Sequence, residues 1–188
     1  MSIERQEFKQ PHSPLGEQLL KEMLAKPSGN KILEIGAKEL GRDSIYFAQE
    51  GNDVVLTDMR SLLERVKGEV GERKLDGNIQ LVISNPEKLA LKNETFDAVF
   101  SLATLDSTYL PDSFKEIYRV LKPKGGAIVM MYKQAGGRVL QDTERIKKWI
   151  TESGLNIIDC WDIEEKGHTP PTIKSVFKLN KEQNEQEG

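Results

Sequence analysis

The sequence predicts a single α/β domain, a doubly wound seven-stranded sheet that is mostly parallel and has an antiparallel last strand. First, short runs rich in Ile and Val alternate with amphipathic helical stretches, which is typical of strand-helix-strand units. Second, the length of 188 residues suits one domain. Third, the last two apolar runs are too close in sequence for a crossover helix, so they pair as an antiparallel hairpin or lie apart.

Five apolar runs are the expected parallel strands, and two further strands follow near the C-terminal end. The five cover residues 31–36, 53–57, 79–83, 96–101 and 127–132, and the last two cover residues 156–163 and 175–179. Because a parallel strand is usually buried on both faces, continuous apolar runs of this kind fit the centre of a sheet.

Helices are expected between the strands. The expected helices cover residues 42–49, 61–74 and 112–121, with a last one that carries Ile146, Trp149 and Ile150 and stops at Gly154. Ser13 and Pro14 open another helix near the N-terminal end. The chain therefore divides into an N-terminal arm and helix at 1–29, a main domain at 30–180 and a tail at 181–188, which we expect to be disordered.

Composition favours a small-molecule ligand. Lys and Arg total 27 against 30 Asp and Glu, a formal net charge of −3, and no segment concentrates basic residues. A protein that binds nucleic acid normally presents a positive surface to the phosphates, so no nucleic-acid partner is expected. Cys160 is the single cysteine and suits a reducing compartment. No run looks like a signal peptide or a membrane span, so a cytoplasmic location and no membrane partner are expected.

Ligands of open α/β sheets bind beyond the carboxyl ends of the strands, so the residues after each apolar run are the first candidates. Gly36 ends the first run and opens a turn in which backbone amides can approach a ligand. Asp58 ends the second run, 22 residues after Gly36. A carboxylate near this spacing can accept both hydroxyl protons of a ribose. The plain alternative is a solvated aspartate that opens the next helix.

Four segments together carry a resemblance to a known family. They are KILEIGAKELGRD at 31–43, the strand that ends at Asp58, ISNPEKL at 83–89 with NETFDAVFS at 93–101, and EIYRVLKPKGG at 116–126. In this order and at this spacing they resemble the motifs of class I S-adenosylmethionine-dependent methyltransferases, especially the type 11 group. The resemblance implies that family's Rossmann-like fold, S-adenosylmethionine as the cofactor, and in-line methyl transfer to a small-molecule acceptor.

The resemblance also implies where the cofactor binds. Glu34, Gly36 and the following loop would hold the methionine part, Asp58 the ribose, and Met59 would lie beside the adenine. Asn85 would accept a hydrogen bond from the adenine amino group. The full set of implied cofactor positions is Glu34, Gly36, Ala37, Lys38, Asp58, Met59, Asn85, Pro86, Ser101 and Leu102, of which the last two would line the reaction chamber.

The glycine loop departs from the family pattern. The family usually has a glycine at every second position, whereas GAKELG at 36–41 lacks the central glycine and has one extra residue. Two interpretations of Lys38 stay open. Its side chain either obstructs the approach of the backbone to the cofactor, or it pairs with the carboxylate of the cofactor.

The catalytic residue is not given by any motif, because methyl transfer from a sulfonium depends mainly on positioning. Candidates by position are Asp106, Tyr109, Tyr132 and His168, of which His168 could take a proton near neutral pH or be an ordinary loop histidine. No metal site is expected, since two histidines and one cysteine give no zinc spacing. The alternatives are a non-catalytic cofactor-binding or interaction protein and an NAD-dependent oxidoreductase, and a homodimer is possible.

Overall fold

The structure, a computed structural model, describes residue 18 and residues 21–75, 77–135, 138–165, 170 and 172–182. Its centre is one sheet with the strand order β3-β2-β1-β4-β5-β8-β7, to which a short β6 adds beside β5. Strands β1 to β5 pair in parallel, and β8 is antiparallel to both β5 and β7. The predicted mostly parallel sheet with an antiparallel last strand is therefore confirmed.

The strands lie close to their predicted positions. They are β1 (Lys31–Ile35), β2 (Asp53–Asp58), β3 (Ile79–Ile83), β4 (Phe96–Leu102), β5 (Leu121–Ala135), β6 (Arg138–Val139), β7 (Asn156–Glu165) and β8 (Thr172–Asn180). The largest difference is β5, which extends well beyond residues 127–132 because it pairs with Phe96 of β4 at one end and with Ile173 of β8 at the other. The two-residue β6 is an eighth strand that the apolar pattern did not indicate.

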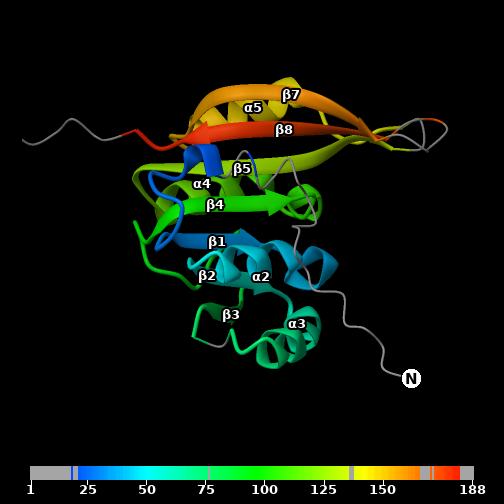
Figure 1. The fold of residues 1–188 in the computed structure, drawn as a ribbon. Helices are drawn as coiled ribbons and strands as arrows, with labels where there is room; N and C mark the ends of the chain where they lie inside the picture. The colour runs from blue at the N-terminus through cyan, green and yellow to red at the C-terminus, as the bar shows by residue number, and fades with distance from the viewer. Residues whose placement is uncertain are drawn as a thin grey trace, which may run out of the picture.

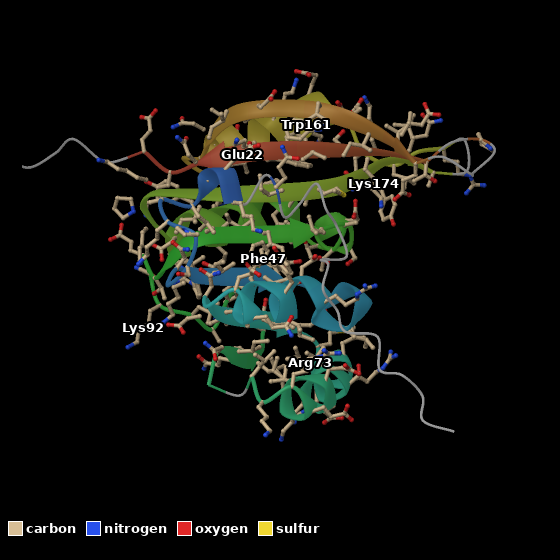
Figure 2. All side chains as sticks on the ribbon, in the orientation of Figure 1. Glu22, Phe47, Arg73, Lys92, Trp161 and Lys174 are labelled. Atoms are coloured by element: carbon tan, nitrogen blue, oxygen red, sulfur yellow. The ribbon has the colours of Figure 1, made fainter. Side chains whose placement is uncertain are left out.

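Helices cover both faces of the sheet (Figure 1). They are α2 (Arg42–Gln49), α3 (Arg60–Glu72), α4 (Leu110–Val120) and α5 (Thr143–Glu152), with short 3-10 turns η1 (Lys38–Gly41) and η2 (Leu105–Ser107). One apolar cluster, which includes Phe47 (Figure 2), joins α2 and α3 to the first face, and a second joins α4 and α5 to the other face. This is the three-layer arrangement of a doubly wound domain.

The N-terminal helix expected from Ser13 lies mostly outside the described residues. Gln18 and residues 21–23 are helical, and Met23 packs against the first face of the sheet. A Cβ atom added to Gly126 of β5 would meet the Met23 methyl group at 2.0 Å, so this glycine allows the helix to lie close to the sheet. Glu22 accepts an ion-paired hydrogen bond from Lys178 of β8 at 3.1 Å (Figure 2).

The C-terminal end of the described chain is anchored in the domain. Lys181, which we expected to begin a disordered tail, is 5% exposed. Its Nζ donates to Glu94 Oε1 and to the Leu121 carbonyl, both at 3.0 Å, and lies 4.5 Å from the centre of the Tyr118 ring. Lys181 is thus part of the packed domain. Within the described ranges, no helix is long and apolar enough to cross a membrane.

Candidate cofactor site

A cavity of about 900 Å³ lies beyond the carboxyl ends of β1 to β4. Its described lining residues are Gly36, Ala37, Leu40, Thr57, Asp58, Met59, Leu62, Arg65, Ile83, Ser84, Asn85, Pro86, Ala103, Thr104, Ser107 and Thr108. This is the edge at which open α/β sheets bind ligands, and the volume lies within the range of ligand pockets. Six of the ten positions implied by the resemblance line it: Gly36, Ala37, Asp58, Met59, Asn85 and Pro86.

Gly36 lies at a point where only glycine fits. Its φ is +98°, and an added Cβ would lie 2.1 Å from Thr104 Oγ1. Thr104 follows Ala103, which also has a left-handed φ of 53° and donates its N–H to the Met130 carbonyl at 2.7 Å. The ends of β1 and β4 are therefore in direct contact at one corner of the cavity.

The irregular loop after Gly36 contains the 3-10 turn η1 and ends at a second glycine, Gly41. Leu40 adopts a left-handed φ of 59° and Gly41 one of 68°, so the chain turns into α2 through two successive left-handed residues. A leucine in this conformation is strained, and such strain is often found at functional sites. Leu40 itself lines the cavity. The side chains of Lys38 and Glu39 lie outside the described part, so both interpretations of Lys38 stay predictions.

Asp58 is held in place by two backbone amides. Its Oδ2 accepts from the Ala37 N–H at 2.5 Å, and its Oδ1 accepts from the Met59 N–H at 2.6 Å. Hydrogen bonds to a carboxylate are stronger than neutral ones, so they fix both the side chain and the glycine loop. Each oxygen keeps a further acceptor site toward the cavity.

Met59 and Ile83 both line the cavity and have large exposed fractions, 66% and 50%. They come from the ends of β2 and β3, which are neighbours in the sheet. Two exposed apolar side chains on adjacent strand ends favour a flat apolar group between them. The next residues, Ser84 to Pro86, form the adjoining wall, where Asn85 Oδ1 accepts from the Glu87 N–H at 3.0 Å.

Glu34 lies beneath the cavity and is not among its lining residues. It is buried, and its Oε2 accepts from both the N–H, at 3.2 Å, and the hydroxyl of Ser44 in the first turn of α2. The N-cap residue Gly41 has no side chain, so this carboxylate satisfies a helix N–H from a neighbouring strand. Burial raises the pKa of Glu34 well above its ordinary value, and the nearby Asp43 charge raises it further.

Ser101 and Leu102 are buried in β4, and the chamber wall is built from the residues that follow them. The Ser101 hydroxyl donates to the Ile35 carbonyl at 3.0 Å, which ties β4 to β1. Because β4 runs to Leu102 and then turns at Ala103, the side chains that reach the cavity are Thr104, Ser107 and Thr108.

Of the four catalytic candidates, the three that lie in the described residues, Asp106, Tyr109 and Tyr132, are not among the residues that line the cavity. Asp106 Oδ1 accepts from the Tyr132 N–H at 2.9 Å, which links η2 to β5. The Tyr132 ring lies 4.8 Å from Lys174 Nζ, and Tyr109 is 60% exposed beside the lining residue Thr108. His168 lies outside the described residues. No group of three or more His, Cys, Asp or Glu side chains that could hold a metal ion occurs in the described ranges.

Several lining residues were missed by the sequence reasoning. Leu62 and Arg65 follow Met59 at three-residue steps along α3, a helical spacing that could have identified them once Met59 was assigned. The other missed residues are Thr104, Ser107 and Thr108. They reach the cavity because the chain turns at Ala103, and the left-handed backbone of this alanine cannot be predicted from the sequence.

Comparisons with known proteins agree with this geometry. The model of a protein family described as a methyltransferase domain matches residues 33–129. Two curated relatives are named ubiquinone/menaquinone biosynthesis C-methyltransferase UbiE. That of Ectopseudomonas mendocina (strain ymp) is 29% identical over 116 residues, which cover 60% of this chain and 45% of the relative. That of Stutzerimonas stutzeri (strain A1501) is 30% identical over 108 residues, which cover 55% and 42%.

The chain thus spans less than half the length of these two relatives. Solved structures share the fold at low identity. The cyclase SpnF matches with a TM-score of 0.76 at 15% identity, and the match covers 88% of this chain and 79% of the SpnF chain. Phosphoethanolamine N-methyltransferase 2 of Haemonchus contortus, in complex with S-adenosyl-L-methionine, has a TM-score of 0.73 at 18% identity and covers 89% and 52%.

We expect Gly36→Ala to lower the free energy of unfolding by about 2 kcal/mol or more, because it adds both a steric overlap and a left-handed alanine. Thr104→Ala in the same chain should recover only the steric part. Urea unfolding of the single and double variants measures this. Gly68→Ala is the matched control: an added Cβ there meets nothing within 4 Å, so it should stabilise α3 by about 0.5–1 kcal/mol. Equal effects at the two glycines would contradict the close contact.

We also expect Glu34 to make stability depend on pH. A folded-state pKa above the ordinary value of 4.5 means that the native protein holds this proton longer, so the contribution of Glu34 to stability falls as pH rises from 4.5 through the raised pKa. Glu34→Gln should therefore gain thermal stability relative to the unsubstituted protein as pH rises above 4.5. Ser44→Ala, which removes a donor to the carboxylate, should steepen the decline. The measurement is the thermal midpoint of the three proteins as a function of pH. The same pH dependence in all three would contradict the prediction.

Proposed function

The chain belongs to the methyltransferase-domain family, whose sequence model matches residues 33–129, and from this premise we propose that it binds S-adenosylmethionine and transfers its methyl group to a small-molecule acceptor. When bound, this cofactor supplies a methyl group on a positively charged sulfur, which a nucleophile takes by in-line displacement. The activity and the acceptor are proposals, since the chain spans only part of its curated relatives.

The described residues fit the cofactor in shape and in chemistry. Gly36 and Ala37 line the cavity at the end of β1, where the methionine part would lie. Asp58 would accept the ribose hydroxyls, Met59 would lie against the adenine with Ile83 opposite, and Asn85 would meet its amino edge. The position of Asp58, fixed by two amides at the cavity wall beside these exposed apolar groups, is the observation that carries the proposal.

On the acceptor side, the protein offers hydroxyl groups. Thr104, Ser107 and Thr108 line the cavity from the segment after β4. The Thr108 hydroxyl is already fixed by the Leu105 carbonyl and the Ser113 hydroxyl, each at 2.9 Å. Such groups can orient an acceptor and exclude water, and correct orientation alone supplies much of the rate in a displacement reaction.

A second function on this fold is favoured by one comparison. The cyclase SpnF shares the fold, so the architecture also supports activity other than methyl transfer. A cofactor-binding protein without methyl transfer is therefore the alternative, and turnover separates it from the main proposal. A cytoplasmic location and assembly as a homodimer complete the proposal and rest on the sequence expectations alone.

Calorimetric titration with S-adenosylhomocysteine, together with mass spectrometry of any adenosyl compound carried through purification, tests the binding. We expect the protein to bind, and Asp58→Asn to weaken binding roughly ten-fold or more, because a hydrogen bond to a charged group contributes about 1.5–3 kcal/mol.

Asp53→Asn is the matched control, since Asp53 begins the same strand at its opposite end and is exposed. The control should bind like the unsubstituted protein. If NADH binds in place of S-adenosylhomocysteine, the proposal fails. Tight binding with no methyl transfer to any of a broad acceptor panel would favour the alternative function.

A further inference from the structure

One segment of the family-like pattern, residues 116–126, supplies none of the described residues that line the 900 Å³ cavity. It contains Glu116 and Arg119 at i,i+3 spacing on α4, joined by two hydrogen bonds: Arg119 Nε to Glu116 Oε1 at 2.7 Å, and Arg119 Nη2 to Glu116 Oε2 at 2.6 Å. The hydrogen bond raises the pKa of Arg119 and lowers that of Glu116, so both stay charged near neutral pH. A pair of this form is rigid, because the guanidinium and the carboxylate meet in a fixed fork.

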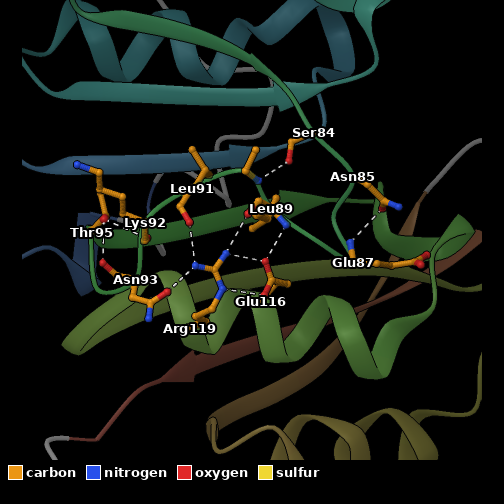
Figure 3. Close-up of polar contacts among 11 residues, drawn as sticks. Ser84, Asn85, Glu87, Leu89, Leu91, Lys92, Asn93, Thr95, Glu116 and Arg119 are labelled. Carbon is orange, nitrogen blue, oxygen red and sulfur yellow. Dashed lines mark hydrogen bonds and ion pairs between the residues drawn. The ribbon is translucent and has the colours of Figure 1, made fainter.

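Both members of the pair hold the connection between β3 and β4 (Figure 3). Glu116 Oε2 accepts from the Leu89 N–H at 2.7 Å, and Arg119 Nη2 donates to the Leu89 carbonyl at 3.0 Å. Arg119 Nη1 donates to the Leu91 carbonyl at 2.8 Å and to Asn93 Oδ1 at 2.6 Å. The backbone of Leu89 is thus bound on both its donor and its acceptor side by a single ion pair.

The held segment leads directly to the cavity. The N–H of Ala90, next to Leu89, donates to the Ser84 hydroxyl at 2.9 Å, and Ser84 lines the cavity with Asn85 and Pro86. Figure 3 shows Ser84 and Asn85 at one end of the connection and the Arg119 pair near its middle. The step from Arg119 to the cavity wall therefore passes through one peptide unit and one hydroxyl.

A second contact ties the same connection to the start of α4. Glu87 Oε1 accepts from the N–H of Tyr109, the N-cap residue of α4, at 2.7 Å. Tyr109 follows Ser107 and Thr108, which line the cavity from the other side. Residues 84–95 have no helix or strand of their own. Backbone hydrogen bonds hold the two ends of this connection, such as Lys88 N–H to the Asn85 carbonyl at 3.0 Å and Glu94 N–H to the Arg119 carbonyl at 2.9 Å. The side-chain bonds of Arg119, Glu116 and Glu87 add to them between these ends.

We propose that Arg119 and Glu116 are positioning residues for the cofactor site: they hold the Ser84–Pro86 wall in its binding shape and so set the affinity for the adenosine part of the ligand without touching it. This inference rests on the proposed function. It differs from a plain structural role, because a structural staple would change stability but leave the affinity of the folded protein unchanged.

The test compares Arg119→Lys with Lys115→Gln. Lysine keeps the charge but cannot donate to Leu89, Leu91 and Asn93 at once. Lys115 pairs with Asp112 on the same helix at the same spacing and makes no contact with the connection, so it is the matched control. The readouts are the dissociation constant of S-adenosylhomocysteine, the thermal midpoint, and amide hydrogen exchange over residues 84–93, all for the full chain well below its midpoint.

Arg119→Lys should weaken binding about five- to twenty-fold and speed exchange at Leu89 and Ala90, while Lys115→Gln changes neither. Ser84→Ala tests whether Arg119 acts through Ser84. If it does, the double variant should weaken binding by less than the product of the two single fold-changes in the dissociation constant. Should Arg119→Lys fail to fold, Asn93→Ala removes one outer bond of the fork and should give a smaller loss of the same kind.

An unchanged dissociation constant with faster exchange, or with only a lower midpoint, would overturn the positioning role and leave the proposed function standing. Absence of binding by the unsubstituted protein would overturn both. An equal loss of affinity in Lys115→Gln would show that disturbing any ion pair on α4 weakens binding, and would also overturn it.

Discussion

Gly36 and Thr104 lie so close that no side chain can stand between them, and the shape of the cavity depends on this contact. Because residue 36 has no Cβ, the chain after β1 can turn away at a φ of +98° directly beside Thr104, the second residue after β4. The left-handed Ala103 completes the arrangement by directing Thr104 back over the glycine. The two central strands of the sheet thereby end in one packed corner of the cavity.

Two carboxylates near this corner have different surroundings and different consequences. Asp58 is bound by two amides at the surface of the cavity, where a carboxylate keeps acceptor sites for a ligand. Glu34 is buried below, where it satisfies the first turn of α2 at the expense of a raised pKa. The same functional group thus lines the cavity in one place and completes a helix end in the other.

The sequence predicted the parts of the fold that depend on local pattern. Alternating apolar runs gave the sheet, its helices and the antiparallel hairpin, and the spacing of Gly36 and Asp58 indicated the cavity edge, because strand ends are marked by the end of an apolar run. Features that depend on backbone conformation were missed. Leu40 and Ala103 adopt left-handed backbone angles that their residue types do not indicate. The cavity is therefore lined by Thr104, where the sequence had predicted Ser101 and Leu102. The bonds from Arg119 to Leu89 span 30 residues and have no local signature.

The anchored end of β8 has a practical consequence for biophysical work. The backbone of Lys181 exchanges hydrogen bonds with Lys124 and Gly125, at 2.8 and 2.9 Å, where β5 begins. Parallel strands begin at the edge of the sheet opposite to the one where they end, so this attachment lies across the domain from the cavity. A sensor chip that captures the protein through a handle placed after this point would therefore leave the cavity mouth facing the flowing solution. An immobilised format of this kind would allow small ligands to be screened with their access unimpeded by the support.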